Sequence, residues 1–175
     1  TGLCGGCENL SRRGIGYVSS DERSFFWRLS GRDNLLFFAR LYGLTSKHGR
    51  ARIEVLLKQF DFEKRADDLF KNYSAGMRKK VSIIRALMHQ PSLLLLDEVT
   101  NSLDPESTAA VKKVIRQYVS AGQGRMAIWS THRLEEMPEI CDGFLIIDSG
   151  RIVSQGAIAD FKSGFKGEKY FASCC

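Results

Sequence analysis

The sequence predicts an α/β fold, a parallel sheet flanked by helices, on the evidence of two short apolar runs and the helical pattern between them. Leu93 to Leu96 form one run, and Met126 to Trp129 form the other. Runs that are apolar on both faces are typical of central strands in parallel sheets. An amphipathic pattern from Pro105 to about Ala121 separates them, and strand, helix, strand is the order of an α/β protein.

Ahead of these elements, Gly16 to Val18 predicts a further strand, and three successive aromatic residues follow it in a loop, Phe25 to Trp27. Such a cluster either belongs to a hydrophobic core or forms a docking surface for a helix of another protein. Both interpretations stay open from the residues alone.

A helical subdomain is predicted from about Arg32 to His89. Ser30, with Asp33 three residues later, resembles a capping box and marks a helix start. An apolar helical face follows it, and Arg50 to Phe60 provide another such face.

The small-residue turn Ser74 to Gly76 precedes a basic amphipathic helix predicted from about Met77 to His89. Three basic residues, Arg78 to Lys80, lie near its first turn, where the helix dipole favours acidic side chains. Unpaired N–H groups, a serine hydroxyl and a glycine together make an anion site. The alternative is that Ser74 is an ordinary N-cap and that the basic turn is solvated.

Asp97 and Glu98 follow the leucine run directly, so they lie at the carboxyl end of a strand, where open α/β sheets bind ligands. The first carboxylate is a candidate to hold Mg²⁺ through water, and the second to polarise a water for attack on a γ-phosphate. His132 follows the second apolar run and is expected at the same edge as a γ-phosphate contact. The alternative is a buried strand that ends in a solvated acidic pair.

The remaining signals are local. Asp104 followed by Pro105 predicts an N-cap with proline at the first helical position. Ser149 and Gly150 lie between two apolar stretches and predict a hairpin. Pro138 lies inside a short helical pattern, which we expect it to kink or end.

Composition favours one domain spanning residues 1–175. The residues are 43% hydrophobic, but no apolar run reaches 18 residues, and no secretory signal opens the chain. A net charge of +6 suits phosphates or an anionic membrane surface, although solvated Lys and Arg residues are the commoner explanation.

Four of the five cysteines lie near the termini, and they are Cys4, Cys7, Cys174 and Cys175. One hypothesis is a zinc site, because the first pair has C-x₂-C spacing. The alternative is that these residues are ragged ends of a truncated reading frame. Cys141 is expected to be a packed thiol.

Taken together, these motifs resemble the nucleotide-binding domain of the ABC ATPases. Tyr73 to Met77 is similar to a degenerate form of the LSGGQ signature. Leu93 to Asp97 resembles the Walker B strand, with Glu98 in the position of the catalytic glutamate. Ser102 to Asp104 matches the D-loop, and Ser130 to His132 matches the H-loop.

The resemblance extends from about Arg12 to Phe165 and implies a P-loop NTPase-like sheet, ABC-type ATPase activity, and ATP and Mg²⁺ as cofactors. It implies that Asp97 holds the metal, that Glu98 is the general base and that His132 contacts the γ-phosphate. The residues implied to serve a nucleotide across a dimer are Ser74, Ala75, Gly76, Met77 and Asp104.

Two departures from the family pattern affect these expectations. The 175 residues contain no G-x-x-x-x-G-K-S/T loop, so we expect a chain truncated at its N-terminus, without the Walker A loop and inactive in isolation. The strand from Met126 to Ser130 is then expected to have one unpaired edge, where the phosphate-loop strand is missing. The Q-loop glutamine is also absent, so its contact to Mg²⁺ would fall to Ser20 or Asp21, or be lost.

The resemblance implies the ATP-binding subunit of an ABC transporter, peripheral on the cytoplasmic face of a membrane. Its implied partners are a transmembrane permease subunit, whose coupling helix meets the region of Phe25 to Trp27, and another ATPase domain in a homo- or heterodimer. The stretch from Asp21 to Leu35 resembles exporter subunits most. One alternative is a P-loop-less binding or regulatory module that completes a partner's ATP site. Another is an ABC ATPase of DNA repair or translation, but no coiled-coil insert is present, and no nucleic acid is expected.

Overall fold

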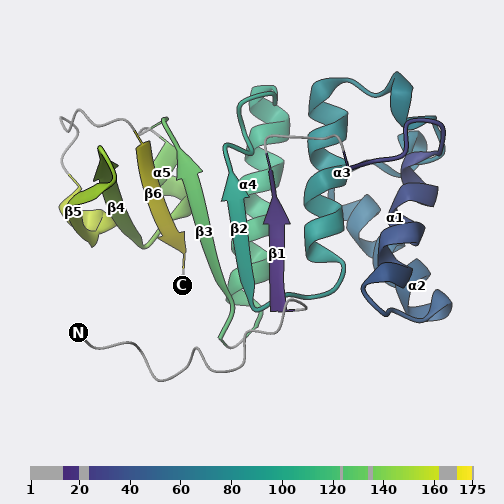
Figure 1. Ribbon diagram of the computed structural model, residues 1–175, viewed down its shortest axis with the longest axis horizontal. Helices are drawn as coiled ribbons and strands as arrows, with labels where there is room; N and C mark the ends of the chain where they lie inside the picture. The colour runs from purple at the N-terminus through teal and green to yellow at the C-terminus, as the bar shows by residue number, and fades with distance from the viewer. Residues whose placement is uncertain (1–13, 20–23, 123, 134–135, 162–168, 175) are drawn as a thin grey trace.

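A computed structural model describes residues 14–19, 24–122, 124–133, 136–161 and 169–174 of the chain. Six strands form one sheet in the order β1-β2-β3-β6-β4-β5 (Figure 1). In chain order the strands are β1 Ile15–Val18, β2 Leu93–Asp97, β3 Met126–Thr131, β4 Gly143–Asp148, β5 Arg151–Ala157 and β6 Lys169–Cys174. The helices are α1 Gly31–Leu41, α2 Ser46–Gln59, α3 Ala75–Leu87, α4 Pro105–Ser120 and α5 Met137–Ile140.

The predicted capping residues begin their helices as expected. The hydroxyl of Ser30 accepts a 3.0 Å hydrogen bond from the backbone N–H of Asp33 and donates one of 2.7 Å to its carboxylate. Asp104 accepts a 2.8 Å hydrogen bond from the N–H of Ser107, with Pro105 as the first residue of α4. Each cap satisfies a backbone donor that the helix leaves unpaired, which explains why α1 and α4 start where they do.

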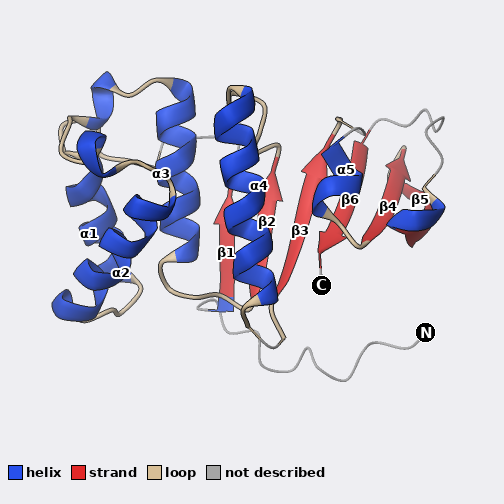
Figure 2. Ribbon diagram, turned by 180° about the vertical axis from the view of Figure 1, so that it is seen from behind, coloured by secondary structure: helices blue, strands red, loops and turns tan. Residues whose placement is uncertain are grey.

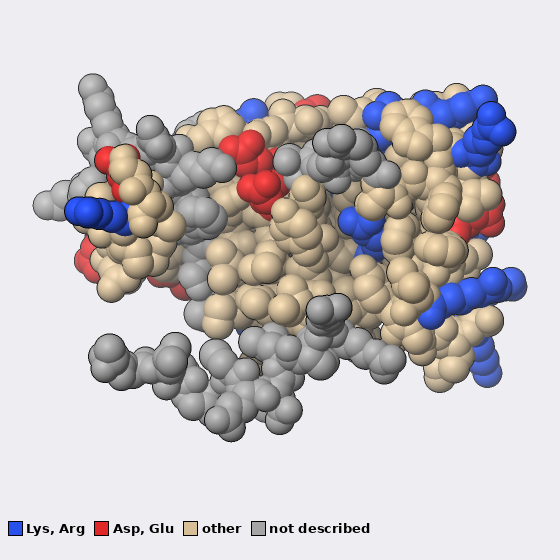
Figure 3. All heavy atoms as spheres, in the orientation of Figure 1, with Lys and Arg blue, Asp and Glu red and all other residues tan. Residues whose placement is uncertain are grey.

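The strands β1, β2 and β3 are parallel, as predicted. Helices α3, α4 and α5 lie over one face of the sheet, and α1 and α2 extend the helical layer beyond β1 (Figure 2). Gly16 allows this close packing, because a Cβ there would lie 2.5 Å from the carbonyl oxygen of Ala86 in α3. The other face is covered mainly by uncharged side chains (Figure 3), and Tyr17 is 52% exposed on β1.

The expectation of an unpaired edge on β3 is wrong. Strand β6 lies between β3 and β4 and is antiparallel to both, so that Ala172 is opposite Trp129 on one side and Phe144 on the other. Two strands that run in the same direction can share an antiparallel neighbour, and residues near the C-terminus supply it. The sheet is therefore mixed, and the N–H and C=O groups of β3 have partners on both sides.

The C-terminal hairpin is confirmed, whereas the effect expected of Pro138 is not. Strands β4 and β5 are antiparallel, and Ser149 and Gly150 between them both have positive φ, 49° and 75°, as a tight hairpin turn requires. Pro138 is the second residue of α5. It neither kinks nor ends the helix, because a first-turn residue has no intrahelical N–H bond to lose.

The three aromatic residues after β1 partly fit both predictions, a core cluster and a docking surface. Phe25 is buried and stacks on Phe70, with ring centroids 4.6 Å apart. Phe26 and Trp27 are 46% and 45% exposed. One of the three aromatics therefore belongs to the core, and two remain on the surface.

Candidate functional site

Two acidic residues begin the site at the carboxyl end of β2. Asp97 is the last residue of the strand, and the parallel register places it opposite Ser130 of β3. The Ser130 hydroxyl donates a 2.6 Å hydrogen bond to Oδ1 of Asp97. The backbone N–H of Glu98 donates a 3.1 Å hydrogen bond to the carbonyl oxygen of Ser130. The two strand ends are thus joined immediately beside both carboxylates.

Glu98 holds its side chain between two polar groups. The Asn101 side-chain amide donates a 2.7 Å hydrogen bond to Oε2 of Glu98, and Nδ1 of His132 lies 3.2 Å from Oε1. The side chains of Glu98 and His132 are 31% and 56% exposed, so solvent reaches the pair. The structure therefore brings Asp97, Glu98 and His132 to one edge, as the strand order predicted.

Glu98 also has an unusual backbone. Its φ of 48° lies in the left-handed region, which costs a residue with a side chain about 1–2 kcal/mol. Its backbone hydrogen bond to Ser130 and the fully buried side chain of Val99, the next residue, hold it there. Strain of this kind persists where the surroundings impose it, and it turns the Glu98 carboxylate toward His132.

A buried polar network supports the segment that follows. The hydroxyl of Thr100 donates a 2.9 Å hydrogen bond to Glu136, and Arg133 forms a 3.3 Å ion pair with the same carboxylate. Thr100 is fully buried, and Glu136 is 6% exposed. The network links the segment that follows Glu98 to the segment that follows His132. It therefore holds the backbone in place on both sides of the contact between Glu98 and His132.

The small-residue turn before α3 lies at the same end of the molecule. Helix α3 leads from its C-terminal end to the start of β2 (Figure 1), so its first turn is near the carboxyl ends of the strands. Gly76 packs closely there, because a Cβ would lie 3.2 Å from the carbonyl oxygen of Ser102 and 3.5 Å from Leu103. Ser74 caps the helix by accepting a hydrogen bond from Met77, and Ser74 and Ala75 are exposed.

Two of the three basic residues near this turn contact other parts of the protein. The alternative that the basic residues of this turn are solvated is therefore wrong for both of them. Lys79 is 3% exposed, and its ammonium donates a 3.0 Å hydrogen bond to the carbonyl oxygen of Ser19. Arg78 donates to the carbonyl oxygen of Tyr73, and its guanidinium lies 4.8 Å above the Trp27 ring. Lys79 therefore joins α3 to the end of β1, and Arg78 joins α3 to the aromatic loop.

Asp104 is fully exposed and serves as the N-cap of α4. Hydrogen bonds from Ser107, first from its backbone N–H and then from its side chain, lower the pKa of Asp104, and Lys80 adds to the lowering. The carboxylate therefore stays ionised well into acid. A negative charge at the N-terminus of α4 is favourable in the field of the helix dipole, so Asp104 has a structural role independent of any role in ATP binding.

The donor set of Asp97 fits a hard cation. The Ser130 hydrogen bond uses Oδ1, and no hydrogen bond to Oδ2 is present within the described residues. Mg²⁺ is commonly held by one or two carboxylates, waters and substrate phosphates. No group of three or more His, Cys, Asp or Glu side chains able to hold a metal occurs in the described part of the chain. Asp97 would hold Mg²⁺ only together with oxygens of a ligand.

Several predicted residues cannot be placed. Ser20 and Asp21, the candidates to replace the Q-loop glutamine, lie outside the described residues. The same is true of Cys4, Cys7 and Cys175, so the zinc hypothesis is not tested. Cys141 is buried, as expected of a packed thiol.

Sequence reasoning missed three supporting residues. The resemblance to the H-loop assigned no role to Ser130. Aligning the two apolar runs as parallel strands would have placed Ser130 opposite Asp97, as the structure does. Asn101 reaches Glu98 from three residues away, a spacing visible in the sequence. Lys79 bonds to a residue 60 positions away, and no local pattern could have indicated that contact.

Comparison with known proteins identifies the family. The family model described as ABC transporter matches residues 6–101, more than half of the chain. This chain belongs to the ABC transporter family. The finding agrees with the signature-like turn, the acidic strand end and the histidine at one edge of the sheet.

Curated ABC relatives match most of the chain. The ABC transporter ATP-binding protein NatA of Bacillus subtilis (strain 168) is 35% identical over 144 residues, which are 82% of this chain and 58% of NatA. The linearmycin resistance ATP-binding protein LnrL of the same strain is 32% identical over 90% of this chain and 50% of its own length. The Nod factor export ATP-binding protein I of Mesorhizobium japonicum is 32% identical over 84% of this chain and 42% of its own length. The chain thus spans roughly half the length of these ABC proteins.

Solved structures agree on the ABC fold. An ATP-binding subunit of an ABC transporter aligns with a TM-score of 0.74 and 28% identity, covering 85% of this chain and 61% of that one. The cbiO1 protein of Clostridium perfringens, part of the ABC transporter complex cbiONQ, aligns with a TM-score of 0.70 and 29% identity over 83% of this chain and 58% of its own. None of the helices in the described residues is long and apolar enough to cross a bilayer.

Proposed function

We propose that this chain is the ATP-binding subunit of an ABC transporter and couples ATP binding and hydrolysis to the movement of a solute across a membrane. The observation that carries the proposal is the contact between Glu98 and His132 at 3.2 Å, beside Asp97 at the end of a central strand. A general base must lie within hydrogen-bond reach of the water that it activates, and a carboxylate held from both sides is suitably oriented. The names of NatA and the Nod factor export protein agree with this role.

In this proposal each residue at the edge has one task. Asp97 would hold Mg²⁺ through its second carboxylate oxygen, and the bound metal would neutralise charge on the phosphates. Glu98 would accept the proton of the attacking water, with Asn101 fixing its other oxygen. His132 would contact the γ-phosphate. Because the 175 residues contain no G-x-x-x-x-G-K-S/T loop, the cradle for the phosphates would have to come from residues outside them.

The turn before α3 would serve a second ATPase domain. Ser74 and Ala75 are exposed at the start of the helix, and Gly76 rests on the D-loop backbone. A partner's nucleotide would therefore meet Ser74, Ala75, Gly76 and Met77, while Asp104 would link the two sites. The turn could transmit movement to the D-loop of its own chain, because no side chain separates Gly76 from Ser102.

A permease subunit would dock on an aromatic surface beside α1, placing the chain on the cytoplasmic face of a membrane. Phe26 and Phe37 meet edge to face with centroids 4.8 Å apart, and both are more than 40% exposed. Trp27 and Leu41 are exposed as well. Exposed aromatic anchors of this kind are favourable at protein interfaces.

A second candidate is a regulatory module that completes a partner's ATP site without binding ATP alone. Strand β6 favours it, because β6 occupies the position next to β3 where the family resemblance implies the phosphate-loop strand. A phosphate loop contributes several charge-assisted hydrogen bonds, and losing three of them would weaken ATP binding by roughly a thousandfold. Under this candidate, calorimetry on the 175-residue chain finds no ATP binding at micromolar concentration.

The decisive experiment restores the phosphate loop. The strand, loop and helix of NatA would be fused so that they replace β6 beside β3, and ATP turnover would be measured with Glu98→Gln and with Glu106→Gln. The second variant is the control, because Glu106 is an exposed residue of the first turn of α4. We expect Glu98→Gln to reduce turnover by about a hundredfold or more while ATP stays bound. Turnover within about threefold of the restored parent would assign the base to another residue.

A further inference from the structure

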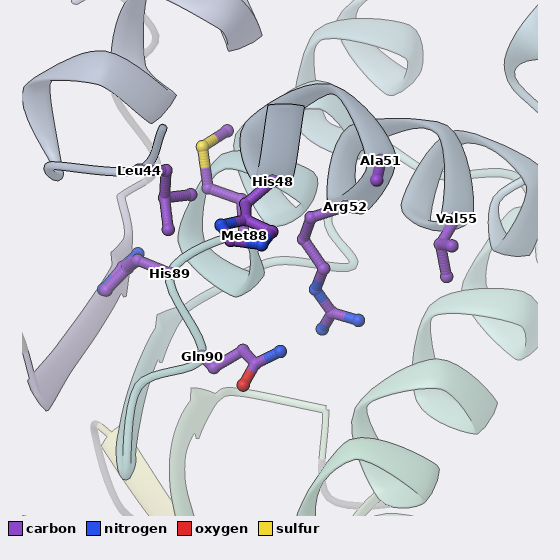
Figure 4. Close-up of a pocket in the computed structure, with 8 residues that line it drawn as sticks. All are labelled: Leu44, His48, Ala51, Arg52, Val55, Met88, His89 and Gln90. Carbon is purple, nitrogen blue, oxygen red and sulfur yellow. The ribbon is translucent and has the colours of Figure 1, made fainter. Parts of the chain in front are cut away.

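Two adjoining cavities lie at the opposite end of the sheet from the acidic pair. One, of about 460 Å³, lies between α2 and the end of α3 (Figure 4). The other, of about 200 Å³, lies between α2 and α4. Arg52 lines both, and in Figure 4 its guanidinium extends from α2 toward Gln90, just before β2 begins. The two cavities thus share Arg52, and we refer to them together as the groove.

Arg52 is a half-buried cation without a counterion among the described residues. Its Nε atom is buried and has no hydrogen-bond partner, and no ion pair to it occurs among the described residues. Burial lowers the pKa of Arg52, and Arg125 adds to the lowering, although Tyr118 opposes it. Burying a guanidinium in this position destabilises the fold, since no carboxylate among the described residues offsets the free-energy cost of its desolvation.

The groups around Arg52 favour an anion. Arg125 is held nearby: it donates a 3.1 Å hydrogen bond to the carbonyl oxygen of Tyr118 and its guanidinium lies 4.3 Å above that ring. Gln59 and Gln117 add amide donors to the same cavity. Among the described residues, no Asp or Glu side chain lines either cavity. Two fixed cations without an acidic neighbour create a local positive potential.

The larger cavity adds an apolar wall to this positive centre. Leu44 and Met88 line it on one side of Arg52, and Ala51 and Val55 line it on the other (Figure 4). The rings of His48 and His89 line the same cavity. Burial lowers the pKa of His89, so that ring is neutral at pH 7 and does not add to the charge. A ligand here would present an oxyanion to the arginines and an apolar group to this wall.

We propose that this groove binds a small amphiphilic oxyanion, a carboxylate or phosphate that carries an apolar group. The oxyanion lies between Arg52 and Arg125, where it completes the hydrogen bonding of both guanidinium groups. The apolar group lies against Leu44 and Met88, which line the same side of the larger cavity. The site is separate from the proposed ATP site, because it lies at the amino ends of the parallel strands.

The test measures melting temperature against the concentration of three probes: inorganic phosphate, hexyl phosphate and hexanoate, at matched ionic strength. Phosphate also stabilises proteins without binding a site, so Arg52→Met, Arg125→Met and Arg50→Met are compared with the parent. Arg50 is the control, because it is exposed on the same helix and lines neither cavity. We expect Arg52→Met and Arg125→Met to weaken hexyl phosphate binding at least tenfold and Arg50→Met to leave it unchanged.

A second readout separates a ligand site from a structural role. If Arg52 is kept for a ligand, Arg52→Met melts at the same or a higher temperature than the parent without ligand, because an uncompensated charge is removed. A lower melting temperature in Arg52→Met would assign Arg52 a structural role and overturn the proposal. Equal shifts in all variants would overturn it too. If inorganic phosphate binds as tightly as hexyl phosphate, the apolar part of the ligand is wrong.

Discussion

The hydroxyl of Ser130 donates a 2.6 Å hydrogen bond to Oδ1 of Asp97, joining the ends of two parallel strands. Ser130 is 7% exposed, so water does not readily replace this bond. The contact orients Asp97 and leaves its Oδ2 without a hydrogen bond among the described residues.

Ser130→Ala should therefore lower the free energy of unfolding by about 1–2 kcal/mol, the cost of leaving a charged acceptor without its donor. Urea denaturation measures it. Ser120→Ala is the matched control, since that hydroxyl only bonds back to α4 from an exposed position. Equal effects of the two substitutions would show that the strand-end bond adds nothing to stability.

Gly16→Ala should destabilise the protein more than Gly150→Ala. A Cβ at position 16 would lie 2.5 Å from the carbonyl oxygen of Ala86 and 2.8 Å from both Leu94 and Pro91, so β1 and α3 would have to separate. Such overpacking costs about 1–3 kcal/mol or more. A Cβ at Gly150 would have no atom within 4 Å. Only the backbone strain at its positive φ of 75° destabilises Gly150→Ala, by roughly 1 kcal/mol. Thermal melts of both variants decide the order, and the reverse order would contradict the packing of β1 on α3.

Stability should fall in mild acid through His89. Burial lowers the pKa of this ring, which stacks on Tyr42 at 4.2 Å and lies 3.1 Å from the carbonyl oxygen of Ile15. Because the folded pKa is below the unfolded value of about 6.5, the unfolded chain binds the proton first, and the free energy of unfolding decreases as pH falls below about 6.5. The contribution of one group is at most about 1.4 kcal/mol per pH unit.

Urea denaturation between pH 7 and pH 5 tests this in the parent, His89→Phe and His48→Gln. His89→Phe should have a shallower pH dependence than the parent, while His48→Gln, altered at an exposed position on α2, should match the parent. An unchanged slope in His89→Phe would mean that another group causes the loss of stability.

Ala172→Pro should open the sheet between β3 and β4. Ala172 lies opposite Trp129 on one side and Phe144 on the other, and proline cannot donate to either ladder. We expect binding of a hydrophobic dye and loss of cooperative melting, because two strand edges become exposed. Ala172→Ser is the control and should fold like the parent. Cooperative melting of the proline variant without dye binding would show that β6 is dispensable.

The helix starts and central strands were predictable because their determinants are local. A side chain that caps a helix, as Ser30 and Asp104 do, acts within three residues of its own position. The meeting of Glu98 with His132 was also predictable, because each directly follows a strand of the same parallel sheet and such strands end at one edge.

The tertiary structure alone decided which segment completes the sheet and which cations are buried. Nothing in the sequence of Lys169 to Cys174 specifies β3 and β4 as its neighbours, since strand pairing depends on which edges the rest of the fold leaves open. The burial of Lys79 and of Arg52 likewise has no signal in their own helices. Their burial follows from the packing of α3 beneath the loop after β1 and of α2 against α4, contacts between segments far apart in the chain that no local pattern encodes.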